Sequence, residues 1–169
     1  MKVKLITYPD KILKAKSEDV KKIVDNTIRL LDNMQEIMYK YKGIGLAAPQ
    51  VGINVRVAII DLQKNDPGFG LVEMINPEIL ENAGNFEEHE EGCLSVPDFY
   101  SPVPRGKYIK IKYIDRKGEE KTIETDTFFS VVAQHEVDHL NGILFIDRIS
   151  LLRKELFRNH RRKTRLKTG

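Results

Sequence analysis

The sequence predicts an α+β fold, in which mostly antiparallel sheets surround a central helix that carries a metal site, with one further helix at each end. Two observations favour this class. Segments rich in β-branched residues lie together in the middle of the chain, with helical patterns before and after them. The chain has 169 residues, of which 41% are hydrophobic and 31% charged, as expected for one soluble domain of ordinary size.

The N-terminal helix is predicted over residues 21–42. Its hydrophobic residues recur at spacings of three and four, which places them on one face of a helix. They are Val24, Ile28, Leu31, Met34, Met38 and Tyr41. Gly43 follows directly and ends the helical pattern.

Four segments in the middle of the chain are predicted to be strands. Val55–Leu62 is short and rich in β-branched residues, which is typical of a buried strand. In Tyr108–Ile114, isoleucines and a tyrosine alternate with lysines, so one face of this strand is apolar. The remaining segments are Leu71–Ile75, Tyr108–Ile114 and Glu120–Glu124, the last entered through a hairpin turn at Lys117-Gly118.

The central helix is predicted over Thr125–Leu140. Thr125 or Asp126 is the expected N-cap, and Asn141-Gly142 ends the helix. A third helix is expected from about Ser150 into the C-terminal segment, anchored on the body by four apolar residues: Leu151, Leu152, Leu156 and Phe157. We therefore divide the chain into a catalytic domain, residues 1–152, and a basic helical tail, residues 153–169.

The net charge of +3 conceals an uneven distribution. The tail holds eight basic side chains against one acid, which leaves 20 basic and 24 acidic side chains in residues 1–152. The basic residues are Arg153, Lys154, Arg158, Arg161, Arg162, Lys163, Arg165 and Lys167. A solvated terminus that aids solubility and a segment that binds a polyanion are both compatible with this pattern.

Cysteine content and hydropathy bear on the compartment. One cysteine is present, so no intramolecular disulfide forms, which suits a reducing compartment. No segment approaches the ~20 apolar residues that a membrane helix needs, and residues 1–5 are too polar for a secretory signal. We expect a cytoplasmic protein that does not act at a membrane.

The strongest chemical signal is the HExxH motif at His135–His139, inside the central helix. Residues four apart on a helix are turned by about 40°, so both imidazoles point the same way and can bind one ion. Glu136 lies beside them, where it can move a proton on a water at the ion. Taken alone, the motif also occurs by chance, with both histidines as packed or surface residues.

A hydrolytic site with one metal ion needs a third protein ligand. Position 145 is Phe145, and the later candidates, Glu155 and His160, lie in the tail. Upstream, Cys93 lies between Gly92 and Pro97 in a segment of small residues. A lone cysteine is usually a small buried hydrophobe. With the histidine pair it would complete a Cys/His/His set that keeps one coordination position open, as catalytic sites do.

Three segments resemble the signature motifs of the peptide deformylase family. They are Gly43-Ile44-Gly45-Leu46-Ala47-Ala48-Pro49-Gln50, Glu91-Gly92-Cys93-Leu94-Ser95 and Gln134-His135-Glu136-Val137-Asp138-His139. Their order, their separations and the length of the chain also resemble that family, so the similarity covers nearly the whole sequence.

The resemblance implies a function and assigns roles to the motif residues. The metal ligands would be Cys93, His135 and His139, and Glu136 would be the acid/base. The Gln50 side chain and the Leu94 backbone N–H would stabilise the oxyanion. The substrate would be the N-formylmethionyl end of a nascent peptide, and its binding residues would be Ile44, Gly45, Gly92, Phe128, Val131 and Val132.

The resemblance also bears on the cofactor, the tail and a supporting ion pair. It implies one divalent metal ion per chain, with Fe(II) favoured in the cell and Zn(II), Ni(II) or Co(II) as alternatives. It implies binding of the tail to the ribosome, and a charge pair between Glu91 and Arg105. The chain departs from many bacterial members by carrying Phe99-Tyr100 where they have an arginine.

Two other functions are compatible with the residues alone. An HExxH endopeptidase would normally take its third ligand from downstream of the motif, and no such residue stands at the usual position. A metal-stabilised RNA-binding module would explain the basic tail, yet residues 1–152 are net acidic. Without the resemblance, Gln50 would be read as a polar loop residue and Gly43 and Gly45 as turn residues.

Overall fold

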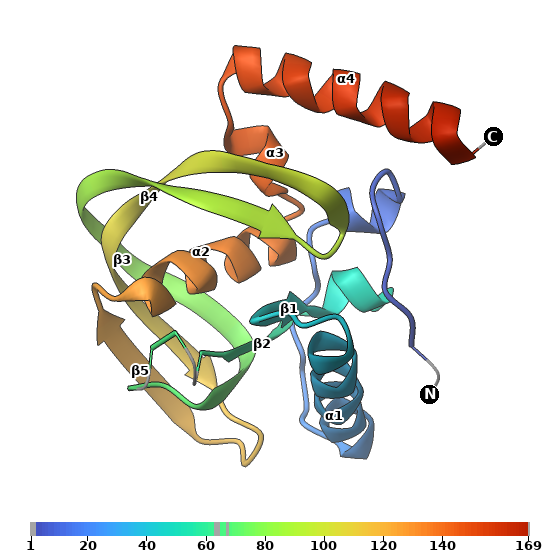
Figure 1. Ribbon diagram of the computed structural model, residues 1–169. Helices are drawn as coiled ribbons and strands as arrows, with labels where there is room; N and C mark the ends of the chain where they lie inside the picture. Colours follow the sequence, from blue (N-terminus) through green and yellow to red (C-terminus); the bar gives the residue numbers. More distant parts are fainter. Residues whose placement is uncertain (1–2, 63–64, 67, 169) are drawn as a thin grey trace.

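The computed structural model describes residues 3–62, 65–66 and 68–168, and it confirms the α+β fold (Figure 1). Within this part of the chain, five strands form one antiparallel sheet in the order β1-β2-β3-β4-β5. The strands are β1 Gly45–Ala47, β2 Val57–Asp61, β3 Leu71–Cys93, β4 Val96–Ile114 and β5 Glu120–Thr125. The helices are α1 Asp25–Lys40, α2 Phe128–Leu140, α3 Phe145–Arg148 and α4 Leu151–Thr168, with short 3₁₀ turns η1 Lys11–Lys14 and η2 Ala48–Val51.

Strands β3 and β4 are far longer than the sequence predicts. Leu71–Ile75 and Tyr108–Ile114 are correctly placed, but they are only the first and last parts of a hairpin that continues to Cys93 and Val96. The pairing shifts register at four places along the hairpin, which breaks the alternation of apolar and polar residues. The bulges also let the hairpin bend, and in Figure 1 it curves around α2.

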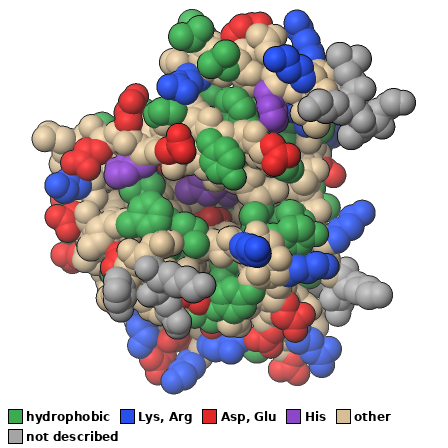
Figure 2. All heavy atoms as spheres, viewed as in Figure 1, with side chains coloured by type: hydrophobic (Ala, Val, Ile, Leu, Met, Phe, Trp, Pro, Cys, Tyr) green, Lys and Arg blue, Asp and Glu red, His purple; other side chains and the backbone are tan. Residues whose placement is uncertain are grey.

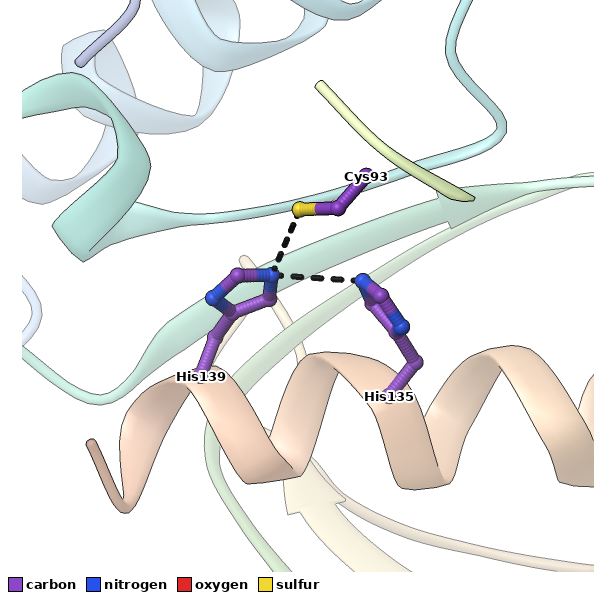
Figure 3. Close-up of side chains that lie close together, drawn as sticks. All are labelled: Cys93, His135 and His139. Atoms are coloured by element: carbon purple, nitrogen blue, oxygen red, sulfur yellow. Dashed lines mark hydrogen bonds between the residues drawn. The ribbon is translucent and has the colours of Figure 1, made fainter. Parts of the chain in front are cut away.

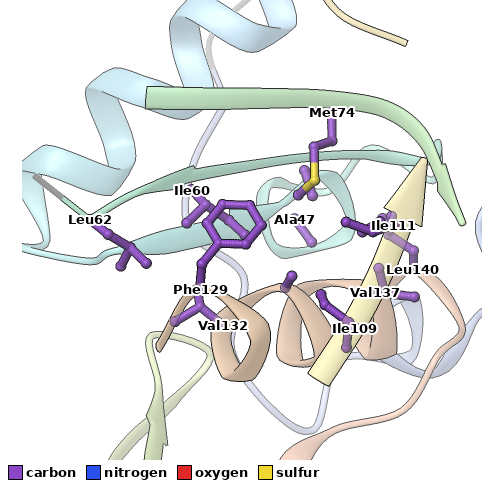
Figure 4. Packing of buried hydrophobic residues seen from close by; sticks show 12 residues of the cluster. Ala47, Ile60, Leu62, Met74, Ile109, Ile111, Phe129, Val132, Val137 and Leu140 are labelled. Atoms are coloured by element: carbon purple, nitrogen blue, oxygen red, sulfur yellow. The ribbon is translucent and has the colours of Figure 1, made fainter. Parts of the chain in front are cut away.

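Helix α2 lies at the centre of the fold, inside the curved sheet (Figure 1). Phe129, Val137 and Leu140 pack against β2, β3 and β4 in the main hydrophobic core (Figure 4). The helix begins at Phe128 and its N-cap is Thr127, so the expected cap at Thr125 or Asp126 is wrong. Those two residues belong instead to the end of β5 and the short connection that follows it.

Helix α1 packs on β1 and β2 through a second core cluster that includes Leu31, Met34 and Met38. The predicted apolar face is therefore correct in its middle. Its two ends are wrong, because Val24 is 52% exposed and Tyr41 is 46% exposed. Both lie just outside the helix, as its N-cap and C-cap residues, where the helical periodicity no longer holds.

The C-terminal helix is present as predicted, but it is anchored differently. Phe157 is buried, whereas Leu151, Leu152 and Leu156 are 84%, 73% and 49% exposed. Arg161 is also held, since it donates to the Tyr8 carbonyl at 3.0 Å and lies over the Tyr8 ring. The side chains of Arg165 and Lys167 lie outside the described residues.

None of the helices in the described ranges combines the length and the apolar character that crossing a membrane requires.

Candidate metal centre

The three predicted ligands come together at the middle of the molecule (Figure 3). His135 and His139 project from the same side of α2, and Cys93 reaches them from the end of β3. The Cys93 Sγ atom lies 3.2 Å from His139 Nε2, which lies 3.2 Å from His135 Nε2. His89, in the acidic stretch of β3, is not part of this cluster.

The spacing of the donor atoms fits one tetrahedral metal ion. Typical bond lengths of about 2.3 Å to sulfur and 2.0–2.1 Å to nitrogen place neighbouring ligand atoms roughly 3.3–3.6 Å apart. The two measured separations of 3.2 Å are close to this value, and all three donor atoms lie within 4.8 Å of one another. A thiolate and two imidazoles suit Zn(II), Fe(II), Co(II) or Ni(II) and leave one position for a substrate.

A carboxylate fixes the orientation of the first histidine. Glu91 Oε2 lies 2.9 Å from His135 Nδ1, so that nitrogen is engaged and Nε2 faces the other ligands. The predicted charge pair is present, because Arg105 donates twice to Glu91, at 2.6 and 2.9 Å. Burial alone would raise the pKa of Glu91, but the bonds from Arg105 and His135 lower it to about 2.

Glu136 is buried beside the predicted ligands, and one of its carboxylate oxygens has no hydrogen-bond partner in the described part of the chain. Its side chain is 3% exposed, and Oε2 has no hydrogen-bond partner among the described residues. Burial raises its pKa to about 7, and the nearby His135 opposes that rise. A carboxyl group with this pKa can both accept and donate a proton near neutral pH, which is what a general acid–base residue needs.

Gln50 is held in a fixed orientation next to Cys93. Its Oε1 accepts from the Ala47 N–H at 2.8 Å, so Nε2 points the other way, 3.4 Å from Cys93 Sγ and 3.2 Å from Ser95 Oγ. Ser95 in turn donates to the Ile6 carbonyl. Leu94 and Ser95 form the two-residue turn that joins β3 to β4, which brings the Leu94 backbone close to the same place.

A pocket of about 680 Å³ opens over this cluster. In Figure 2 histidine is visible in a hollow near the centre of the face, among hydrophobic side chains. His139 is buried behind the pocket and does not line it. All the other site residues predicted from the sequence line it: Ile44, Gly45, Gln50, Gly92, Cys93, Leu94, Phe128, Val131, Val132, His135 and Glu136.

The two residues at the position where many bacterial members have arginine take different places. Phe99 packs inward, with ring centroids 6.2 Å from Phe145 and 5.0 Å from Phe157. Tyr100 is 65% exposed and forms part of the pocket rim. Its ring covers the backbone of Gly92, because a Cβ atom built there would lie 2.4 Å from Tyr100 Cε1. An aromatic ring therefore occupies this part of the rim.

Sequence reasoning missed three residues around the centre: Ser95, Asp138 and Arg148. Asp138 is buried and accepts from both Arg105 and Arg148. Its presence inside the HExxH motif, on a helix predicted to be buried, was a usable signal, because a buried carboxylate needs a cationic partner. The partners themselves come from β4 and α3, so the sequence gives no local sign of the pairing.

Comparisons with known proteins agree with this geometry. The family model for polypeptide deformylase matches residues 2–155. The peptide deformylase of Thermodesulfovibrio yellowstonii is 45% identical over 151 residues, which cover 89% of this chain and 91% of that protein. A peptide deformylase from Legionella pneumophila superposes with a TM-score of 0.88 at 34% identity, covering 98% of this chain and 97% of the other. A peptide deformylase from Synechococcus elongatus, solved in complex with actinonin, gives a TM-score of 0.84 at 38% identity, covering 88% and 81%.

Proposed function

The chain belongs to the polypeptide deformylase family, and we propose that Cys93, His135 and His139 are the metal ligands of its active site. As a member of this family it hydrolyses the N-terminal formyl group of formylmethionyl peptides and releases formate. The convergence of one sulfur and two nitrogen atoms within 4.8 Å of one another, with Cys93 and His135 lining the pocket, supports the ligand assignment.

In this proposal Glu136 moves the proton. When bound, a divalent cation supplies positive charge that polarises the formyl carbonyl and acidifies the attacking water. Glu136 accepts a proton from that water as it adds to the formyl carbon. The same carboxyl group then donates the proton to the amine nitrogen as the C–N bond breaks and formate leaves. Its burial and its pKa of about 7 support both roles.

Gln50 and Leu94 are proposed to stabilise the negative charge on the formyl oxygen in the transition state. The Ala47 N–H fixes Gln50 so that its amide N–H groups face the Cys93 side of the pocket. The Leu94 N–H lies in the adjoining turn. Donors held in place before the reaction cost no reorganisation during it, and each is typically worth on the order of 10²–10³ in turnover.

The formyl group is small, so recognition depends on the methionine side chain and the peptide backbone. We propose that Ile44, Phe128, Val131 and Val132 form the apolar wall that accepts this side chain, since all four line the pocket. Gly45 lies in β1, which is an edge strand of the sheet, Gly92 lies near the end of β3, and both line the pocket. An extended peptide can pair with such an edge through its backbone.

The activity and the ligand set can be tested together. Formate release from a formyl-methionyl tripeptide should be measured with anaerobically purified protein, whose metal content should be about one ion per chain. We propose Fe(II) as the ion in the cell, with Zn(II), Ni(II) or Co(II) able to replace it. Cys93→Ala should lose most of the metal, and full occupancy in that variant would show that Cys93 only packs.

A second measurement separates this function from that of an HExxH endopeptidase. A peptide without a formyl group should remain intact, and a formylated peptide should lose formate without internal cleavage. Cleavage at an internal peptide bond by the metal-loaded protein would contradict the assignment of Glu136 and the pocket to deformylation.

We also propose that the tail binds the ribosome, and that the protein works in the cytoplasm where formylated nascent chains emerge. Arg162 and Lys163 are exposed on α4, and no ion pair involves them in the described part of the chain. Tethering near the exit of the nascent chain would raise the local substrate concentration without altering the active site. Arg161 is less available, because it is bound to Tyr8.

Reversing the charge of Arg162 and Lys163 to Glu tests the tail. Turnover of a short formyl peptide should not change, whereas ribosome binding should weaken. Binding by the unaltered protein should also fall steeply with salt, as release of counterions from phosphates requires. Equal ribosome affinity of the two proteins at low salt would mean that these charges serve only solubility.

A further inference from the structure

Helix α3 places Arg148 against the buried carboxylate of Asp138. Arg148 Nε donates to Oδ2 and Nη2 donates to Oδ1, each at 2.5 Å, so the pairing is bidentate. The Asp138 side chain is 8% exposed, whereas that of Arg148 is 41% exposed. Arg148 therefore covers a buried charge from the surface, and none of the catalytic roles proposed above involves this residue.

Asp138 is the first link in a chain of ion pairs that leads to the metal centre. Its Oδ2 also accepts from Arg105 Nη1 at 2.6 Å, and Arg105 donates twice to Glu91. Glu91 Oε2 lies 2.9 Å from Nδ1 of the ligand His135. Two arginines and two carboxylates alternate along this chain, so their formal charges cancel, and removal of Arg148 alone leaves one negative charge in excess.

We propose that Arg148 is a positioning residue for the metal site, acting through this chain of ion pairs. The proposal rests on the ligand assignment made above. Without Arg148, the buried Asp138 keeps one cationic partner, Arg105, and competes with Glu91 for its guanidinium. An unpaired buried carboxylate is costly, so Arg105 shifts toward Asp138. Glu91 then holds the ligand ring less firmly, and the ion binds more weakly.

The expected size of the effect follows from the distance along the chain. Loss of a group that directly contacts a ligand typically costs 10–100-fold in metal affinity. Arg148 acts three ion pairs beyond Glu91 and is partly exposed, so we expect about a three- to tenfold rise in the metal dissociation constant. This loss concerns metal binding itself and is measurable without any assay of turnover.

The test uses the full chain with Arg148→Met, which keeps much of the apolar stem and removes the charge. The dissociation constant for Zn(II) is measured anaerobically by competition with a chromophoric chelator. Arg148→Lys should recover only part of the affinity, because an ammonium group cannot replace the bidentate guanidinium. Arg158→Ala is the matched control, since Arg158 pairs only with Glu155 on the exposed face of α4 in the described structure, and it should leave the constant unchanged.

A double-substitution cycle tests the route. In an Asp138→Asn background the carboxylate is already absent, so Arg148→Met should add little further loss. An unchanged Zn(II) constant in Arg148→Met would overturn the proposal, even if its thermal unfolding temperature fell, because only a structural role would remain. The same loss in both backgrounds would overturn it as well. Failure of the unaltered protein to bind metal would instead contradict the ligand assignment.

Discussion

Gly45→Ala is expected to inactivate the enzyme by moving Glu136 while leaving the metal in place. A Cβ atom at position 45 would lie 2.3 Å from Glu136 Oε1 and 3.1 Å from Val132 Cγ1. An ordinary van der Waals contact of a Cβ atom lies at 3.4–4 Å, so the carboxylate must shift by roughly 1 Å. A displacement of that size at a catalytic group can cost on the order of 10²-fold in rate. Overpacking of this kind should also cost about 1–3 kcal/mol of stability.

The assay compares kcat, KM and metal content in the alanine variant and the unaltered protein, below the unfolding transition of both. We expect kcat to fall about 10²-fold with one metal ion per chain retained, because the three atoms nearest to the added methyl group belong to Glu136 and Val132 and not to a proposed ligand. Gly68→Ala is the matched control. The nearest contact of a Cβ atom there is Asp66 Oδ1 at 3.6 Å, which is ordinary packing, so its kinetics should not change.

Normal kcat in Gly45→Ala would refute the reasoning, since Glu136 would then work equally well from a displaced position. A rise in KM with unchanged kcat would point to the other role of this glycine, as the strand edge along which the substrate lies. Loss of the metal would show that the strain passes into α2 and disturbs the histidines. The three results are distinguishable in one set of measurements.

Substitutions at three other positions separate the remaining roles. Glu136→Ala should keep the metal and lose at least 10²–10⁴ in turnover, and near-normal turnover at full occupancy would place the base elsewhere. Gln50→Ala should lower kcat by on the order of 10²–10³, whereas a change in KM alone would make Gln50 a binding residue. Tyr100→Ala should raise KM for a formyl tripeptide roughly fivefold, which corresponds to about 1 kcal/mol of binding free energy, whereas Tyr100→Phe should have a nearly normal KM. Equal KM values in the unaltered protein and both variants would exclude a substrate contact by the ring.

The sequence predicts those parts of the structure that depend on short spacings. The HExxH pair lies on one helix, so the direction of both imidazoles follows from helical geometry alone. The centre of α1 and the strand β2 follow from local periodicity in the same way. Cys93 could be proposed from the residues as a candidate third ligand, but its assignment relied on the resemblance to a family, because it lies 42 positions before His135 and no local rule brings the two together.

Predictions failed where tertiary contacts override local pattern. The acidic segment before Glu91 lies outside the predicted strands, yet it is part of β3, and its partners include Pro102 and Pro104. Leucines at the start of α4 look like anchors, but Leu151 and Leu152 face solvent and Phe157 alone of the four is buried. Backbone pairing and the direction in which a helix leaves the body decide these cases, and neither is encoded by spacing.

The turn at Leu94-Ser95 explains why the proposed third ligand comes from upstream of the HExxH motif. This turn is the end of the curved β3–β4 hairpin, and it places the Cys93 thiol and the Leu94 backbone next to each other in the pocket. Ser95 Oγ lies 3.2 Å from Gln50 Nε2 and donates to the Ile6 carbonyl, which ties the turn to the segment that carries Gln50. The proposed metal ligand Cys93 and the proposed oxyanion donors are therefore parts of one connected unit. A ligand supplied from a downstream helix would hold the ion equally well, but it would leave the oxyanion donors without this shared support.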